Sequence, residues 1–501
     1  MGIPFFFSYI IKNHPNIIKK IDFLKKSCYF FLDSNSIIYN CLNNFISEEK
    51  LILDVCLKID QYIKIIQPTK KIFIAFDGVA PAAKLNQQRK RRHKSFFEKQ
   101  FSVNEEKWDK IAITPGTNFM NKLNSTIKNY YIDNDKVIIS GSDEIGEGEH
   151  KIFQYIRDHK ITSSVIYGLD ADLIMLGLNH LYNNEIFLFR ETPEFIKSIN
   201  SSLEPNMNYF LDLPLLSIEL KKYMKFKCKS DHLQDYIFLC FFLGNDFLPH
   251  FPSLNIRTHG IDFLLNAYYI TNSKKKTKLI ENSMINWKNV KKLIKYLAEQ
   301  EFENLTKEYK MRAKWDKRST NEISKIPMYN RSLEKYINPY EINWEKRYYN
   351  SLFDCKNIDY ICKNYLEGLE WVFHYYNSGC IDWKWMYDFN YPPLLKDLVL
   401  FVPDMDIKIL KTKQNTAVHP YVQLSYVLPQ QCLGLLPTNL YIKLIKHKSN
   451  CYTNHFNFCW AFCKYFWESH IILPKINLNE LETFVEFNLN GTKHLPQYSQ
   501  N

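Results

Sequence analysis

Four short apolar runs recur in the first third of the chain, and acidic residues follow each of them within a few positions. The runs are residues 29–32, 72–76, 137–139 and 165–169. The segments between them have helical patterning, near residues 36–46, 51–66, 81–101, 117–131 and 147–159. Buried strands separated by helices predict an α/β fold with a mainly parallel central sheet flanked by helices. Ligands of such sheets bind in the crevice beyond the carboxyl ends of the strands.

Acidic residues gather at these predicted strand ends and at similar element ends. There are seven of them: Asp33, Asp77, Glu147, Glu149, Asp170, Asp172 and Asp246. Carboxylates in one crevice repel one another unless cations neutralise them. Mg²⁺ and Mn²⁺ prefer oxygen ligands, and a pair of such ions is a common device for phosphodiester cleavage. We therefore predict a nuclease whose catalytic acids bind two Mg²⁺ or Mn²⁺ ions. For Asp33 or Asp172 taken singly, a helix N-cap is the alternative.

Glu147 and Glu149 are two residues apart, so they cannot share one face of a regular helix. They converge if Gly146 and Gly148 keep this segment irregular just before the following helix. His150, the next residue, is expected to orient a neighbour or to be structural, and not to act as a catalytic base.

A basic segment follows Asp77 closely. The run KLNQQRKRR places Lys84, Gln88, Arg91 and Arg92 on one face of a helix, at i, i+4, i+7 and i+8. Guanidinium groups bind phosphate oxygens bidentately, so this face fits a terminal phosphate. The alternative is a general nucleic-acid patch or a localisation signal. Glycine and proline in the preceding DGVAPAAK place the helix start beside Asp77, which favours the phosphate pocket.

Composition restricts the class of protein only mildly. The 65 Lys and Arg exceed the 53 Asp and Glu, giving a net charge of +12, which favours a polyanionic partner.

The twelve cysteines form no CxxC pair, which favours a reducing compartment and argues against a zinc ribbon. Cysteine or histidine recurs every four residues from 451 to 463, which predicts a helix with an apolar stripe, with a metal site as the alternative. The apolar start MGIPFFFSYII lacks the features of a signal peptide, and no run is long enough to span a membrane. We therefore expect a soluble cytoplasmic protein, with the nucleus as the alternative.

The chain divides into three parts by its patterning. Residues 1–270 form the predicted catalytic nuclease domain, and residues 346–501 form a second region, expected to complete the active-site pocket. Between them, residues 271–345 are polar and rich in lysine, which is typical of an insertion or a solvated connector.

Several motifs resemble, in order, the signature blocks of the XRN family of 5′→3′ exoribonucleases. They are DGVAPAAKLNQQRKRR, GEGEHKIFQYIR, YGLDADLIMLGL and FLGNDFLPHFPSL, together with MGIPFFF, ITPGTNFM, WVFHYYNSGCIDWKWMY and LPQQCLGLLP. The resemblance covers most of residues 1–270 and about 345–475. The chain resembles a compact catalytic core of this family, without the family's long C-terminal extensions.

The resemblance implies a fold, an activity and residue roles. The fold would be a PIN or flap-nuclease-like sheet with a helical second region. The activity would be divalent-metal-dependent degradation of decapped, 5′-monophosphorylated single-stranded RNA to 5′-mononucleotides. The seven acids match the metal ligands of the family, and Lys84, Gln88, Arg91 and Arg92 match its 5′-phosphate pocket.

The resemblance also implies two aromatic residues that stack on the first base. The chain has Tyr39 where the family has histidine, which keeps a flat ring but changes its hydrogen bonding. The distal partner would be Trp383, with Trp385 as the second choice.

Two other functions remain open at this point. A structure-specific flap endonuclease would use a similar carboxylate cluster on branched DNA, and the KLNQQRKRR and WVFHYYNSG blocks count against it. A non-catalytic RNA-binding scaffold would be expected to have lost acids, and all seven are present.

Overall fold

A central sheet organises the N-terminal half of the molecule. The computed structural model describes residues 2–21, 28–101, 108–224, 232–314, 322–411 and 416–490. Among these residues, seven strands pair in the order β1-β7-β6-β5-β2-β3-β4. The parallel strands are β2 (Tyr29–Asp33), β3 (Ile72–Ala75), β4 (Val137–Ser140), β5 (Ser163–Tyr167) and β6 (Glu185–Glu191). The fold class predicted from the sequence is confirmed: a mainly parallel sheet flanked by helices.

Two antiparallel strands extend one edge of this sheet. β7 (Asn208–Asp212) pairs with β6, and the short β1 (Ile18–Lys19) pairs with β7. Neither strand was predicted from the sequence. β1 has only two residues, and β7 lies beyond the strands that alternate with helices in the first third of the chain.

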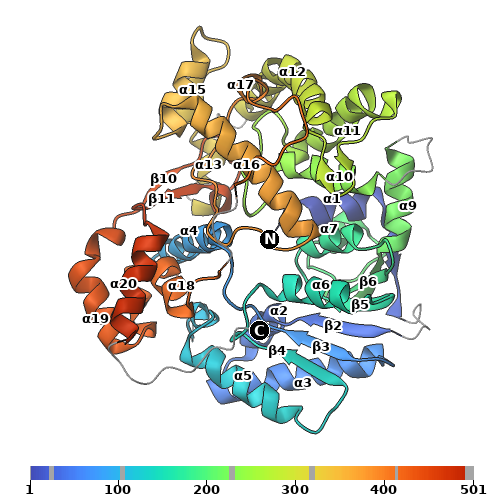
Figure 1. The fold of residues 1–501 in the computed structure, drawn as a ribbon, viewed down its shortest axis with the longest axis vertical. Coiled ribbons are helices and arrows are strands. Elements are labelled where there is room, and N and C mark those ends of the chain that lie inside the picture. Colours follow the sequence, from blue (N-terminus) through green and yellow to red (C-terminus); the bar gives the residue numbers. More distant parts are fainter. Residues whose placement is uncertain are drawn as a thin grey trace.

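Alternating side chains of the strands pack against helices on both faces of the sheet. Phe31 belongs to the core on one face, with α6 (Gly148–Asp158) and α7 (Asp172–Asn179). Phe30 and Leu32 point to the other face, where they pack with α3 (Glu48–Ile66) and α5 (Asn118–Tyr130). Figure 1 shows these two helical layers above and below the sheet. This alternation is the two-residue period of a strand buried on both sides.

Helix α4 (Ala82–Lys99) leaves the sheet and packs against the C-terminal helices. Leu85 shares an apolar cluster with α18 (Pro420–Val427), α19 (Thr438–His447) and α20 (Leu478–Asn490). These C-terminal helices, red in Figure 1, therefore lie beside the basic helix although more than 300 residues separate them in sequence.

Most of the remaining helices lie beyond α6 and α7 (Figure 1), whereas α2 (Asn35–Cys41) packs with α3 on the other face of the sheet. The long helix α16 (Ile358–Asn377) packs against α7. The other helices are α1 (Phe6–Asn13), α8 (Ile196–Ile199), α9 (Leu213–Tyr223), α10 (Leu233–Cys240), α11 (Gly260–Thr271), α12 (Trp287–Ala313), α13 (Ile326–Tyr329), α14 (Ser332–Ile337), α15 (Trp344–Leu352) and α17 (Leu395–Leu398).

The lysine-rich stretch of residues 271–345 contributes to the core. It contains the strand pair β8 (Ile280–Glu281) and β9 (Met284–Ile285) and the 27-residue helix α12. Trp287, Leu293 and Leu297 on α12 are fully buried, while the lysines lie on its other faces. The division of the chain into three parts stays a prediction, but this helix packs as a core element.

The helix predicted from the four-residue spacing between 451 and 463 is absent, and that prediction is wrong. β10 (Asn457–Cys459) pairs there with β11 (His470–Ile472) in an antiparallel hairpin. A short apolar run fits a strand as well as a helix, and spacing alone does not separate them. Within the described ranges, no helix combines the length and apolar character that crossing a bilayer requires.

Candidate active site

The carboxyl ends of the parallel strands bring five predicted acids into one pocket. Asp33 ends β2, Asp77 and Asp170 follow β3 and β5, and Glu147 and Glu149 stand at the start of α6. All five line a pocket of about 160 Å³. Their convergence follows from the parallel register, in which Asp33 lies beside Ala75 at the same sheet edge.

Gly148 allows these acids to approach one another. Its backbone N–H donates to Asp77 Oδ1 at 2.7 Å. A Cβ added at this position would lie 2.8 Å from Asp33 Oδ1, closer than real side chains come. The irregular backbone predicted at both glycines is found only at Gly146, where φ is +104°. Gly148 is already the first residue of α6. Position 148 therefore needs glycine for space rather than for an irregular backbone.

Lys84 connects the acids to the basic helix. Its ammonium lies 2.6 Å from Glu147 Oε2 and 3.0 Å from Asp246 Oδ2. Burial disfavours the charged ammonium, but the surrounding carboxylates, chiefly Glu147 and Asp246, raise the pKa of Lys84 well above its usual value. Asp246, from the loop after α10, thereby joins the cluster.

Hydroxyl and amide groups fix three of the carboxylates. On α16, the hydroxyl of Tyr375 donates to Glu147 Oε1 at 2.6 Å, and the hydroxyl of Tyr376 donates to Asp172 Oδ1 at 2.7 Å. Asn35 Nδ2 donates to Asp77 Oδ2 at 2.7 Å. None of these three donors was predicted from the sequence. Asn35 follows Asp33 closely, but the tyrosines lie in a helix far along the chain and look like ordinary core aromatics.

The N-terminal segment packs against Asp172, which is the first residue of α7 and is buried. A Cβ at Gly2, where φ is +57°, would lie 2.1 Å from Asp172 Oδ1. The MGIPFFF block therefore contributes to the wall of the site, a role that sequence reasoning did not assign to it.

The electrostatics of the cluster favour a bound cation. Burial, followed by the charge of Asp77, raises the pKa of Asp33 well above its usual value. Burial, followed by the charge of Asp172, does the same to the pKa of Glu149. Burial raises the pKa of Asp172 to about 6. In the described part of the chain, the buried Glu149 Oε2 has no hydrogen-bond partner. A divalent cation would offset this repulsion and satisfy that oxygen.

The donors fit a hard cation. Ligand atoms of Glu147, Glu149 and His150 lie within 4.8 Å of one another. The imidazole of His150 packs against the ring of Tyr375, with centroids 3.7 Å apart and the planes tilted by 30°, and burial lowers its pKa well below the usual value. A buried imidazole packed in this way agrees with the structural or orienting role expected for His150. Carboxylate oxygens therefore dominate the set, as Mg²⁺ and Mn²⁺ prefer.

The four predicted phosphate-binding residues line the same pocket as the acids: Lys84, Gln88, Arg91 and Arg92. Arg92 Nη1 donates to Gln88 Oε1 at 3.1 Å, and Nη2 donates to Thr114 Oγ1 at 2.7 Å. Burial, with Arg91 nearby, lowers the pKa of Arg92 to about 10. An anion in the pocket would relieve this unfavourable burial of cations. Thr114 was not predicted, although it lies in the ITPGTNFM block.

The predicted aromatic residues lie in different surroundings. Tyr39 lines the pocket and is 41% exposed. Trp383 is partly exposed, and its carbonyl accepts a hydrogen bond from Ala82 N, at the start of α4, at 2.8 Å. Trp385 is buried and stacks on Trp371, with centroids 5.3 Å apart. Of the two tryptophans, Trp383 is therefore the more exposed, and neither is among the residues that line the acidic pocket.

Comparison with protein-family descriptions covers most of the chain. A family model described as "XRN 5'-3' exonuclease N-terminus" matches residues 1–192. A second, described as "Xrn1 helical domain", matches residues 228–339 and 331–490. The first match takes in every strand of the central sheet except β7, and the second takes in the helical layer that carries Tyr375 and Tyr376.

Curated relatives show the same relationship over most of this chain. "5'-3' exoribonuclease 1" of Saccharomyces cerevisiae is 27% identical over 87% of this chain and 40% of its own length, and that of Homo sapiens is 29% identical over 87% and 31%. The chain thus spans less than half the length of either relative. Among solved structures, the catalytic core of Rad2 with a DNA substrate aligns over 62% of this chain and 79% of its own, at 12% identity and a TM-score of 0.33. On the family matches, the chain belongs to the XRN 5′–3′ exonuclease family.

Proposed function

We propose that this chain is a divalent-metal-dependent 5′→3′ exoribonuclease that degrades 5′-monophosphorylated single-stranded RNA to 5′-mononucleotides. One observation carries the proposal: acids and a basic helix face line the same small pocket. Lys84 joins the two sets, since its ammonium contacts Glu147 and Asp246. Recognition of a terminal phosphate and hydrolysis of the adjacent bond would then take place within one nucleotide of each other.

The seven acids would bind two Mg²⁺ or Mn²⁺ ions: Asp33, Asp77, Glu147, Glu149, Asp170, Asp172 and Asp246. Ions bound there would supply an activated water and stabilise the charge of the leaving oxygen. The chain fixes three of these carboxylates in advance through hydrogen bonds from Asn35, Tyr375 and Tyr376. Fixed ligands reduce the reorganisation that the reaction requires.

The basic face would bind the 5′-phosphate. Arg92 is oriented by Gln88 and Thr114, so its guanidinium is fixed before a ligand arrives. Tyr39 and Trp383 would stack on the first base and direct the strand toward the acids. A triphosphate or a cap would be too large or wrongly charged for this basic face, so decapped RNA would be the substrate.

A degradation assay with three RNA substrates tests the proposal. The same single-stranded RNA would carry a 5′-monophosphate, a 5′-hydroxyl or a 5′-triphosphate, with Mg²⁺ present, and Asp170→Ala as the control. We expect rapid release of mononucleotides from the monophosphorylated RNA alone, abolished by the substitution and by a chelator. Comparing Mg²⁺ with Mn²⁺ would identify the ion that the enzyme uses.

Other outcomes would assign a different function. Cutting that ignores the 5′ end, or that prefers branched DNA, would make the chain a flap-type endonuclease. Binding of RNA without hydrolysis of any substrate would make it a scaffold.

A further inference from the structure

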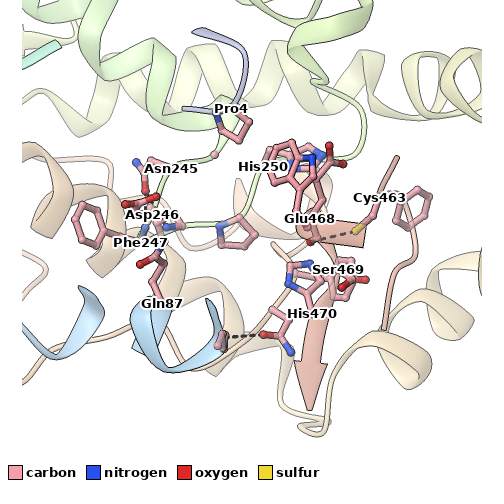
Figure 2. Close-up of a pocket in the computed structure, with 18 of the residues that line it drawn as sticks. Pro4, Gln87, Asn245, Asp246, Phe247, His250, Cys463, Glu468, Ser469 and His470 are labelled. Carbon is pink, nitrogen blue, oxygen red and sulfur yellow. Dashed lines mark hydrogen bonds between the residues drawn. The ribbon is translucent and has the colours of Figure 1, made fainter. Parts of the chain in front are cut away.

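A second cavity lies against a different face of α4. Its volume is about 520 Å³, and it is lined by α4, the loop of residues 243–257, the loop of residues 387–391 and the segment 461–470. Figure 2 shows Gln87, Asn245 and Asp246 on one side of it, with Ser469 and His470 across from them. Arg91 lines both this second cavity and the acidic pocket, so the two adjoin.

Two lysines of α4 face the second cavity. Lys90 Nζ donates to Asn390 Oδ1 at 2.7 Å, and Lys94 Nζ donates to the carbonyls of Trp467 and Ser469 at 2.6 and 2.8 Å. An ammonium has three N–H groups, so both lysines retain donors for a ligand. Burial and the neighbouring Lys94 lower the pKa of Lys90 to about 8, which a bound anion would reverse.

Two of the carboxylates in the lining are paired with cations other than these lysines. Glu468 forms an ion pair with Arg257, and Asp246 pairs with Lys84 on the side of the acidic pocket. Burial raises the pKa of Glu98, and the charge of Lys94 opposes that shift. The second cavity therefore favours an anionic ligand.

Two aromatic rings form an exposed part of the lining. Phe5 and Trp467 are 37% and 43% exposed, and their centroids are 5.9 Å apart. Phe5 has φ of +65°, a left-handed conformation that a bulky residue rarely adopts and that is typical of functional sites. Exposed flat rings of this kind stack on nucleobases.

Buried polar atoms in the lining have no partner in the described part of the chain. They are Ser469 Oγ, on a residue that is 1% exposed, with Gln87 Oε1 and Asn245 Nδ2. Buried polar groups almost always have a hydrogen-bond partner, so these atoms indicate a polar ligand with donors and acceptors.

We propose that the second cavity binds a nucleoside 5′-monophosphate, with its phosphate at Lys90 and Lys94 and its base against Trp467 and Phe5. The phosphate would contact the lysines, and the face of the base would stack on the rings. The sugar hydroxyls and the base edges would contact the unpartnered polar atoms. Such a compound is the product of the reaction proposed above, and its role as product rests on that proposed function. Because Arg91 borders both spaces, a released mononucleotide would pass from the acidic pocket to this site while the strand advances.

Counting AMP sites by equilibrium dialysis tests this assignment without any turnover. AMP can also occupy the acidic pocket, so the count is repeated in Arg92→Gln, which weakens that pocket. We expect two sites in the wild type and one in Arg92→Gln. Adding Lys90→Gln, which keeps an amide donor for Asn390, or Trp467→Ala should weaken the remaining site about tenfold or more, as the loss of a charged hydrogen bond or a stacked base predicts.

Matched controls and further ligands make the result decisive. Lys99→Gln, on the same helix but paired with Asp109 outside the second cavity, should leave the affinity unchanged. Tyr182→Ala removes an aromatic ring that is 90% exposed and should do the same. Inorganic phosphate and adenosine should each bind more weakly than AMP. Should Arg92→Gln fail to fold, a 5′-phosphorylated, hydrolysis-resistant RNA would block the acidic pocket instead.

A single AMP site that Arg92→Gln removes would overturn the assignment. So would a second site that is insensitive to both Lys90→Gln and Trp467→Ala, or one that binds phosphate as tightly as AMP. None of these results would affect the proposed exonuclease, which fails only if 5′-monophosphorylated RNA is not degraded.

Discussion

At the scale of single residues, the absence of a side chain at position 148 sets how closely the acids gather. Gly148 donates its N–H to Asp77, and its Cα faces the carboxylate of Asp33. Around it, Asn35 fixes the same Asp77 from the start of α2, and Tyr375 fixes Glu147 from α16, a helix far along the chain. Small changes at these residues should therefore alter activity while leaving the fold intact.

We expect Gly148→Ala to slow RNA hydrolysis about 100-fold, because displacing a reacting group by roughly 1 Å has effects of this size. The added methyl would lie 2.8 Å from Asp33 Oδ1 and force that carboxylate to move. Single-turnover kinetics at saturating Mg²⁺ would measure the rate. Gly434→Ala is the matched control, since a Cβ there meets nothing within 4 Å. Equal rates in the two variants would refute this role of Gly148.

We expect Tyr375→Phe to raise the Mg²⁺ concentration needed for half-maximal activity about tenfold or more, the usual effect of removing a partner of a metal ligand. The lost hydroxyl donates to Glu147 Oε1 at 2.6 Å. Tyr365→Phe on the same helix removes a hydroxyl that donates to a backbone carbonyl instead, and should leave the Mg²⁺ requirement unchanged. A Mg²⁺ titration of both variants makes the comparison, and identical curves would contradict the prediction.

At the scale of elements, helix α4 forms a wall of both spaces described above. One face presents Lys84, Gln88 and Arg92 to the acidic pocket, and another presents Lys90 and Lys94 to the second cavity. The helical period predicted the first face from sequence. The second face was not predicted, because its partners come from loops near residues 245, 390 and 469.

We expect Arg92→Lys to lower kcat/KM for 5′-monophosphorylated RNA by about tenfold to a hundredfold, because lysine lacks the guanidinium fork. The already slow reaction of 5′-hydroxyl RNA should change little, since it has no phosphate to lose. Steady-state kinetics with both substrates would show whether the discrimination between them shrinks. An equal loss on both substrates would mean that Arg92 does not contact the terminal phosphate.

Helix α12 illustrates a different kind of buried charge. Glu301 Oε1 and Oε2 accept from the backbone N–H groups of Leu395 and Lys396, at 2.8 and 3.2 Å, at the start of α17. Burial raises the pKa of Glu301 to about 7, from an ordinary value near 4.5. The folded state therefore binds more protons than the unfolded state between these values, so this group's contribution to stability is complete below pH 4.5 and declines as the pH rises to 7.

We expect the stability of the wild type relative to Glu301→Gln to fall by about 3 kcal/mol between pH 4.5 and pH 8, from a pKa shift of roughly 2.5 units. Urea unfolding at several pH values would measure both proteins. Glu303→Gln, an exposed site on the same helix, should show no such trend. A constant difference between the wild type and Glu301→Gln would contradict the prediction.

At the scale of the whole molecule, the sequence predicted the sheet and the convergence of the acids, and it missed what covers them. Strand ends are local patterns, and the parallel register then brings Asp33, Asp77 and Asp170 together. Tyr376, by contrast, reaches Asp172 across 204 positions. The same limit applies to the lysine-rich stretch, where charged residues obscured the buried apolar stripe of α12. Local sequence patterns do not indicate which distant segments of the chain will contact each other.

The central claim is that the chain removes single nucleotides from a phosphorylated 5′ end. The most direct test is a time course with single-stranded RNA labelled in its 5′-phosphate, with Mg²⁺ and with a chelator. We predict that the label appears as 5′-mononucleotide from the earliest time point, only with Mg²⁺. Labelled oligonucleotides that appear before any mononucleotide would show internal cutting and contradict the account.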